Sequence, residues 1–206
     1  MYTGITCGLY EVVQVEKKPG LVTYTVRFNA DLVANLKIGA SVAIDGVCQT
    51  VVSIIDEDVC FNAIQETLDR TTIGDLYPGA KVSVERSLCY GDEVGGHNVA
   101  GHVIGIGTVI EVKPTDNNLC LIIQCSKEWM KYILTKGFIA VDGSSLTVGQ
   151  VDPAAATFAL HLIPETLRLT NFGNKKVGDR VNIELDHSTQ TIVTAVERVL
   201  SEMKGW

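Results

Sequence analysis

The segment Gly95-Gly-His-Asn-Val-Ala-Gly-His-Val-Ile-Gly-Ile-Gly107 decides the organisation of this 206-residue chain, because it ends one copy of a pattern and begins the next. Near the N-terminus, Thr3-Gly4-Ile5 is followed by Gly8. Ala100-Gly101-His102, followed by Gly105, repeats this arrangement 97 positions later. The segment also holds two of the four histidines. Functional residues are therefore sought where the two copies differ.

Further motifs repeat in the same order. The hairpin motif Asp45-Gly46 returns 97 positions later as Asp142-Gly143. Two motifs later in each copy recur 99 positions on: Glu66-Thr67-Leu68 as Glu165-Thr166-Leu167, and Gly79-x-x-Val82-x-Val84-Glu85 as Gly178-x-x-Val181-x-Ile183-Glu184. The period is too long for a solenoid unit, so each copy is expected to be a complete small domain.

Short alternating runs separated by turn residues predict antiparallel strands. Residues 9–29 form one predicted hairpin, and a short helix is expected from Asp31 to Leu36 with Asp31 as its N-cap. Closing the strands into barrels removes exposed sheet edges. The predicted fold is all-β: two similar six-stranded antiparallel β-barrels from an internal duplication, plus a C-terminal α-helix. The predicted domains are residues 1–96, 97–187 and 188–206, with the boundary in Ser87–Gly96.

The predicted terminal helix has no counterpart in the first copy. From Ser188 onward, apolar residues fall at helical spacing, with polar residues elsewhere around the helix: Ile192, Val196, Val199, Leu200 and Met203. Such a helix could dock on its own barrel or join subunits, and the sequence leaves both alternatives open.

Composition restricts the class of protein. The chain is 46% hydrophobic and 20% charged, and its net charge of -7 makes nucleic acid an unfavourable partner. Its apolar runs are too short to span a bilayer, and the N-terminus does not resemble a signal peptide. The six cysteines lack Cys-x-x-Cys spacing, so they are predicted to be reduced thiols, most of them small core residues. A cytoplasmic protein is expected.

Two differences between the copies suggest chemistry. His102 stands where the first copy has Ile5, and Cys48 stands where the second has Ser145. A histidine can transfer protons near neutral pH, and a stabilised thiolate can act as a nucleophile. Taken alone, each residue is more often structural. His97 is interpreted as a hinge residue, and no histidine pair shows metal-ligand spacing, so no metal is predicted.

The order of these motifs resembles the riboflavin synthase family, the two-barrel lumazine-binding proteins that include the antenna proteins of luminous bacteria. The resemblance covers essentially the whole chain. It rests on several motifs together: Met1-Tyr-Thr-Gly-Ile, Gly39-Ala-Ser-Val-Ala, Asp45-Gly-Val-Cys-Gln-Thr-Val, Glu66-Thr-Leu, Gly95-Gly-His-Asn-Val-Ala-Gly-His-Val, Lys136-Gly-Phe-Ile-Ala-Val-Asp-Gly-Ser-Ser-Leu-Thr-Val, Leu162-Ile-Pro-Glu-Thr-Leu and Val181-Asn-Ile-Glu-Leu-Asp186.

The resemblance implies a dismutation in riboflavin biosynthesis. Two molecules of 6,7-dimethyl-8-ribityllumazine exchange a four-carbon unit, which gives riboflavin and 5-amino-6-ribitylaminouracil. No metal or redox cofactor is implied. The expected assembly is a homotrimer, in which the N-terminal barrel of one subunit meets the C-terminal barrel of another. Two similar pockets suit two copies of one substrate. Association with lumazine synthase stays open.

The resemblance also implies site residues. His102 would transfer protons at the acidic 7-methyl group, and Cys48, Ser41, Thr147 and Asp186 would assist or orient. The N-barrel pocket would use Gly4, Ile5, Thr6, Cys48, Gln49, Thr50, Asn62, Ala63, Ile64, Gln65, Glu66 and Thr67. The C-barrel pocket would use Gly101, His102, Val103, Lys136, Ser145, Leu146, Thr147, Leu162, Ile163, Pro164, Glu165, Thr166 and Leu167.

Three residues depart from the family pattern. Asn62 stands where many members have an acidic residue, Gln49 replaces a usual leucine, and Ala100 replaces a common serine. The alternative to an enzyme is an antenna protein that binds lumazine or flavin without turnover. Such proteins tend to lose the histidine, so His102, Cys48 and Thr147 favour the enzyme.

Overall fold

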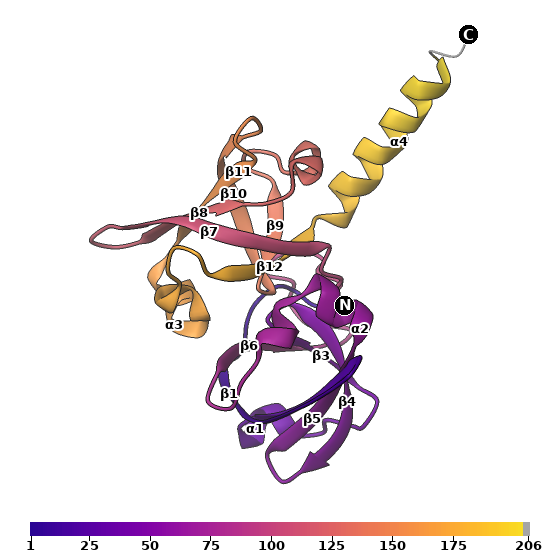
Figure 1. Cartoon of the computed structure of the whole chain (residues 1–206), viewed down its shortest axis with the longest axis vertical. Helices are drawn as coiled ribbons and strands as arrows, with labels where there is room; N and C mark the ends of the chain where they lie inside the picture. Colours follow the sequence, from indigo (N-terminus) through magenta and orange to yellow (C-terminus); the bar gives the residue numbers. More distant parts are fainter. Residues whose placement is uncertain (204–206) are drawn as a thin grey trace.

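Two closed barrels and one projecting helix make up the chain (Figure 1). The computed structural model describes residues 1–203. Residues 204–206, which the sequence places in the terminal helix, lie outside the described residues. The predicted all-β duplication is confirmed, since each barrel contains six antiparallel strands.

The first barrel has the strand order β1-β2-β5-β4-β3-β6. Its strands are β1 (Gly8–Lys18), β2 (Leu21–Arg27), β3 (Ser41–Ile44), β4 (Val47–Ile55), β5 (Asp58–Ile64) and β6 (Lys81–Arg86). Three short helices connect them: α1 (Ala30–Val33), α2 (Gln65–Arg70) and the 3₁₀ helix η1 (Thr72–Asp75). The predicted hairpin in residues 9–29 is therefore β1 and β2.

The second barrel repeats this topology, with the order β10-β11-β8-β7-β12-β9. Its strands are β7 (Gly105–Pro114), β8 (Leu119–Gln124), β9 (Phe138–Val141), β10 (Ser144–Asp152), β11 (Thr157–Leu162) and β12 (Arg180–Leu185). Its short helices are η2 (Lys127–Tyr132), α3 (Pro164–Leu169) and η3 (Asn171–Asn174).

The duplication extends to irregular backbone. The register of β1 shifts between Val12 and Gln14, and that of β7 shifts at the equivalent place, between Val109 and Glu111. Such bulges let strands bend enough to close a barrel. Both Asp-Gly turns have two consecutive residues with positive φ: Asp45 (42°), Gly46 (77°), Asp142 (43°) and Gly143 (81°). This backbone is the tight hairpin turn that an Asp-Gly pair favours.

The core of the first barrel contains a hydrogen-bonded polar pair that the second barrel replaces with leucines. In the first barrel the Tyr24 hydroxyl donates to Gln49 Oε1 at 3.1 Å, and both residues are buried. The equivalent positions in the second barrel are Leu121 and Leu146. The sequence assigned Gln49 to the substrate pocket, but its side chain faces the core and also donates to the main-chain oxygen of Cys48. This side chain is therefore hydrogen-bonded within the first barrel.

Two local predictions were wrong. The N-cap of α1 is Asn29, whose side chain accepts from the Leu32 amide at 2.9 Å; Asp31 lies inside the helix. Asn29 precedes the first helical residue, where a cap must stand.

The six cysteines are unpaired, but Cys120 alone is buried, and Cys7 and Cys89 are exposed. Most of the cysteines are therefore not core residues.

The two barrels meet at their Asp-Gly turns. A Cβ atom added to Gly46 would clash with the amide nitrogen of Gly143, so the turns pack back to back. Buried carboxylates accompany them. Asp45 accepts from the Ser83 amide at 2.7 Å, and Asp142 lies 2.8 Å from Lys175 Nζ. Burial, followed by the neighbouring charge of Asp142, raises the pKa of Asp45 to about 8.

The terminal helix α4 (His187–Met203) projects away from both barrels (Figure 1). No residue in it is buried, and its five spaced apolar residues are exposed. Two of its side chains bond to η2 of the second barrel: Thr194 bonds to Tyr132, and Glu197 pairs with Lys131. Within residues 1–203, no helix is long and apolar enough to cross a membrane.

Candidate functional site

The two N-terminal segments of the repeats meet between the barrels. The Tyr2 amide donates to the Val99 oxygen at 2.7 Å, and the Val99 amide donates back to the Tyr2 oxygen at 3.1 Å. Both side chains are buried with Ala43 and Ala140. This bridge, with a further bond from the His97 amide to the Thr3 oxygen at 3.2 Å, holds the segments side by side, so each one can reach the opposite barrel.

Each segment packs its glycine against the barrel of the other half. The Cys48 amide donates to the Gly101 oxygen at 2.9 Å, and the Ser145 amide donates to the Gly4 oxygen at 2.8 Å. A Cβ atom on Gly101 would lie 2.6 Å from the Cβ atom of Cys48, so only glycine fits. The φ of Gly101 is 78°, which also favours glycine.

This crossing corrects the predicted grouping of the pocket residues. A cavity of about 310 Å³ combines Gly101, His102 and Val103 with residues of the first barrel: Val47, Cys48, Glu66, Thr67, Arg70 and Thr71. The resemblance to the family placed the three segment residues in the pocket of the second barrel. The Gly101 oxygen instead accepts from the Cys48 amide of β4. The amides of Gly101 and His102 bond to Glu184 of β12.

An equivalent cavity of about 200 Å³ lies on the second barrel. It combines Gly4, Ile5 and Thr6, which the sequence assigned to the first barrel, with Ser144, Ile163, Glu165, Thr166, Leu169 and Thr170. The two linings correspond along the repeat, with Glu66 and Thr67 replaced by Glu165 and Thr166. The chain therefore contains two similar cavities, but only the first is lined by a histidine.

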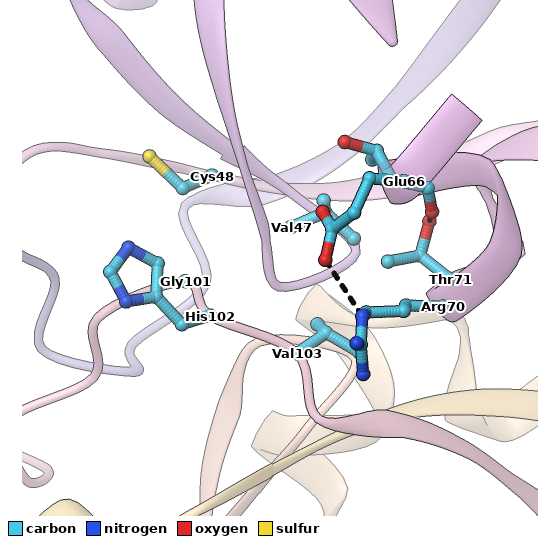
Figure 2. A pocket seen from close by; sticks show the side chains of 9 residues that line it. Val47, Cys48, Glu66, Arg70, Thr71, Gly101, His102 and Val103 are labelled. Carbon is cyan, nitrogen blue, oxygen red and sulfur yellow. Dashed lines mark hydrogen bonds and ion pairs between the residues drawn. The ribbon is translucent and has the colours of Figure 1, made fainter. Parts of the chain in front are cut away.

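The first cavity has two chemically different sides (Figure 2). His102 and Cys48 lie on one side, while Glu66 and Arg70 of α2 form an ion pair of 2.7 Å on the other. The exposed ion pair presents hydrogen-bonding groups to a polar ligand. The arrangement places a titratable imidazole and a thiol beside one space.

The thiol has a buried hydrogen-bond donor. The Tyr2 hydroxyl donates to Cys48 Sγ at 3.2 Å. Burial raises the pKa of Tyr2 well above its ordinary value, so the phenol keeps its proton and acts as a donor to the sulfur. The sequence gave no sign of this role, because Tyr2 and Cys48 are far apart in the chain.

A third cavity, of about 360 Å³, also includes Cys48 and His102. Asp186 also lines it, together with residues at the start of α4: His187 and Ser188. Asp186 Oδ2 accepts from the amide and hydroxyl of Thr189 at 2.8 and 2.6 Å, which caps α4. Burial opposes ionisation of Asp186, but the bonds from Thr189 and the neighbouring His97 keep its pKa below the ordinary value.

His97, which the sequence suggests as a hinge residue, makes side-chain contacts with the second barrel. It is buried, its ring stacks on Phe138 with centroids 5.1 Å apart, and its Nδ1 lies 2.6 Å from Ser145 Oγ. Burial lowers the pKa of His97, and the charge of Asp186 partly opposes this shift. His97 therefore contacts Ser145, the residue of the second barrel that is equivalent to Cys48.

Other predicted residues lie outside these three cavities. Ser41 is paired with Thr50 at the end of the first barrel, while Thr147 is paired with Phe138 in the second. Exposed Lys136 has a φ of 67°, where the first copy has Gly39. Asn62 accepts from Thr23 at 2.8 Å. The remaining predicted positions are Ala63 and Leu162, which are buried, and Ile64, Gln65, Leu146, Pro164 and Leu167 on the adjoining elements.

Comparison with known proteins first defines the class. The family model described as "Lumazine binding domain" matches twice, at residues 3–87 and 100–186. The chain is 45% identical over 202 residues to riboflavin synthase of Escherichia coli (strain K12), covering 98% of this chain and 94% of that protein. It is 40% identical over 201 residues to riboflavin synthase of Chlamydia pneumoniae, covering 98% of each. The chain therefore belongs to the riboflavin synthase family.

Solved structures share the fold. A crystal structure of LumP complexed with riboflavin superposes with a TM-score of 0.84 at 24% identity, covering 91% of this chain and 100% of that chain. A second, of LumP complexed with 6,7-dimethyl-8-(1'-D-ribityl) lumazine, has a TM-score of 0.82 at 23% identity with the same coverage. At this identity the likeness shows the two-barrel fold alone.

Proposed function

We propose that this protein is a riboflavin synthase that converts two molecules of 6,7-dimethyl-8-ribityllumazine into riboflavin and 5-amino-6-ribitylaminouracil. The single observation that carries the assignment of chemistry is the cavity shared by His102 and Cys48. Relatives named riboflavin synthase at 40–45% identity over nearly the whole chain support it.

In the proposed reaction, His102 transfers a proton at the acidic 7-methyl group of one lumazine. Cys48 lies beside it and is oriented by the Tyr2 hydroxyl. An imidazole is suited to this task, because its ring nitrogen can both accept and return the proton. The four-carbon transfer oxidises one lumazine and reduces the other, so no redox cofactor is required.

Two cavities suit two substrate molecules. We propose that one lumazine lies against Cys48, Thr67 and His102, and the other against Thr6, Ser144 and Thr166. Hydroxyl and main-chain groups line both cavities and would bond to the ribityl hydroxyls. Thr50, Asn62, Lys136, Ser145 and Thr147 would extend these contacts.

The proposed assembly is a cytoplasmic homotrimer. Within one chain the two cavities are lined by different barrels, and bringing two lumazines together would require the first barrel of one subunit to face the second barrel of another. The exposed apolar residues of α4 support its role in association, because a helix face of this kind is normally covered.

Replacement of His102 separates turnover from binding. His102→Gln is expected to lower kcat by about 10²- to 10⁴-fold, the range of general acid-base contributions, while lumazine still binds. His161→Gln is the matched control, since His161 is exposed on β11 and lines neither substrate cavity. An equal loss of binding and turnover in His102→Gln would contradict the proton-transfer role. Tight lumazine binding by an inactive wild-type protein would identify the antenna class.

A further inference from the structure

Two buried glutamates hold the segments that line the cavities. Glu85 ends the sequence of β6 before Arg86, and Glu184 occupies the equivalent position in β12. Both are 7% exposed. Neither side chain lines one of the three cavities described above, so neither is placed to touch a substrate.

The bonds made by the two glutamates differ. Glu184 accepts directly from three successive amides, those of Ala100 at 2.6 Å, Gly101 at 2.9 Å and His102 at 3.0 Å. Glu85 accepts from the amides of Thr3 at 2.7 Å and Gly4 at 3.0 Å, and from the Thr3 hydroxyl at 2.7 Å. The His102 amide thus bonds to its carboxylate, whereas the equivalent Ile5 amide is shared between the Thr3 hydroxyl and Glu85.

The reason for this difference is the residue before the glycine. In the first copy, the Thr3 hydroxyl accepts a hydrogen bond from the Ile5 amide at 3.1 Å and donates one to Glu85 Oε1 at 2.7 Å. In the second copy, Ala100 has no hydroxyl. The His102 amide therefore has no local side-chain acceptor and bonds to Glu184 itself.

The opposite edge of the same segment is also fixed. The Gly101 oxygen accepts from the Cys48 amide at 2.9 Å, and there is no space for a side chain at Gly101. Glu184 on the second barrel and Cys48 on the first thus hold one short stretch of backbone between them. The position of the His102 side chain relative to Cys48 follows from this double attachment.

We propose that Glu184 is a positioning residue for the reaction, acting through the three amides to hold the His102 imidazole beside Cys48 at the first cavity. The inference rests on the proposed function. Buried carboxylates that accept several N–H bonds are strong and specific attachments. A shift of about 1 Å in a reacting group can reduce turnover about 100-fold, so a residue that fixes the backbone can control kcat without touching substrate.

The matched pair Glu184→Gln and Glu85→Gln tests the proposal, because each variant replaces one acceptor oxygen by an amide NH₂ that opposes the N–H donors. Glu184→Gln is expected to lower kcat about 10- to 100-fold with KM changed less than about threefold. Glu85→Gln loosens the segment without a histidine, so it is expected mainly to raise KM. Equal effects on kcat, after correction for the folded fraction, would overturn the proposal.

A hydroxyl introduced at position 100 is expected to restore part of the turnover lost in Glu184→Gln. Ala100→Thr in the Glu184→Gln background gives the His102 amide the acceptor that Ile5 has in the first copy, and is expected to recover at least about threefold in kcat. A variant without recovery, although folded, would count against the backbone attachment.

Amide hydrogen exchange separates this inference from the proposed function. Faster exchange in residues 100–103 of Glu184→Gln, with the barrel strands unchanged, is expected whether or not the protein turns over lumazine. If the wild type makes no riboflavin, the proposed function fails while the exchange result still tests the attachment. Unchanged exchange at His102 would show that Glu184 does not hold it.

Discussion

The Cys48 amide donates a hydrogen bond of 2.9 Å to the Gly101 oxygen, which joins a strand of the first barrel to the segment that begins the second half. The equivalent bond runs from Ser145 to Gly4 at 2.8 Å. Each barrel therefore completes its cavity with a segment from the other half. His102 reaches Cys48 for this reason, although 54 positions separate them in the sequence.

Gly101→Ala tests the close approach of this segment. The added Cβ atom would lie 2.6 Å from that of Cys48, and the φ of 78° strains any other residue. Gly79→Ala is the matched control, because its φ is 93° but nothing lies within 4 Å of the added atom. Both variants are expected to lose about 1–2 kcal/mol of stability from backbone strain.

Only Gly101→Ala is expected also to lose turnover, because its methyl group displaces His102 from Cys48. The comparison requires urea unfolding and steady-state kinetics on both variants. Equal activity in the two proteins would show that the close contact is not needed for the reaction.

The Tyr24–Gln49 pair predicts a coupling in stability. Gln49→Leu leaves the buried Tyr24 hydroxyl without its acceptor and is expected to cost about 1–3 kcal/mol. Adding Tyr24→Phe should recover much of this loss, since the second barrel uses Leu121 and Leu146 at these positions. Double-mutant analysis of urea unfolding measures the coupling. Additive losses would mean that the hydrogen bond contributes little.

Asp45 predicts a pH dependence of stability. Its pKa in the folded protein is raised from 3.8 to about 8, first by burial and then by Asp142. The folded state therefore holds a proton that the unfolded chain releases, and this contribution to the free energy of unfolding falls as pH rises from about 4 to about 8. Asp45→Asn cannot ionise, so it should flatten the pH dependence over this range. A parallel pH profile in the variant would contradict the assignment.

The terminal helix predicts the state of assembly. Val196→Glu places a charge within the apolar row of α4 and should yield single chains in sedimentation velocity. Ser201→Glu introduces the same charge elsewhere on the exposed helix and should leave the proposed trimer intact. A trimer that survives Val196→Glu would remove α4 from the interface.

The fold was predictable because the duplication supplied internal evidence. The paired Asp-Gly turns, the recurring glycines and the period-2 patterns all reflect local backbone requirements, which act on neighbouring residues. The N-cap was misplaced because Asp31 and Asn29 are both capable of capping, and the choice depends on where the strand before the helix ends. Sequence patterns locate such boundaries poorly.

The sequence predicted which residues carry chemistry, but not which barrel each of the two N-terminal segments packs against. Comparing the copies selected His102 and Cys48, yet it could not show that the segments cross between barrels, because that depends on the Tyr2–Val99 bridge. The repeat of Glu85 and Glu184 was visible in the sequence. The different bonds of the two glutamates could not be predicted, because residues that are alike in both copies were assigned to the fold alone. Only the structure shows that the His102 amide bonds to Glu184, because Ala100 has no hydroxyl to accept from it.

The most direct test is the stoichiometry of the reaction. Purified protein, without added metal or redox cofactor, is incubated with 6,7-dimethyl-8-ribityllumazine while substrate and both products are followed by chromatography. Two lumazines should disappear for each riboflavin and each 5-amino-6-ribitylaminouracil formed. Lumazine that binds but is recovered unchanged, or riboflavin formed without the uracil product, would contradict the proposed dismutation.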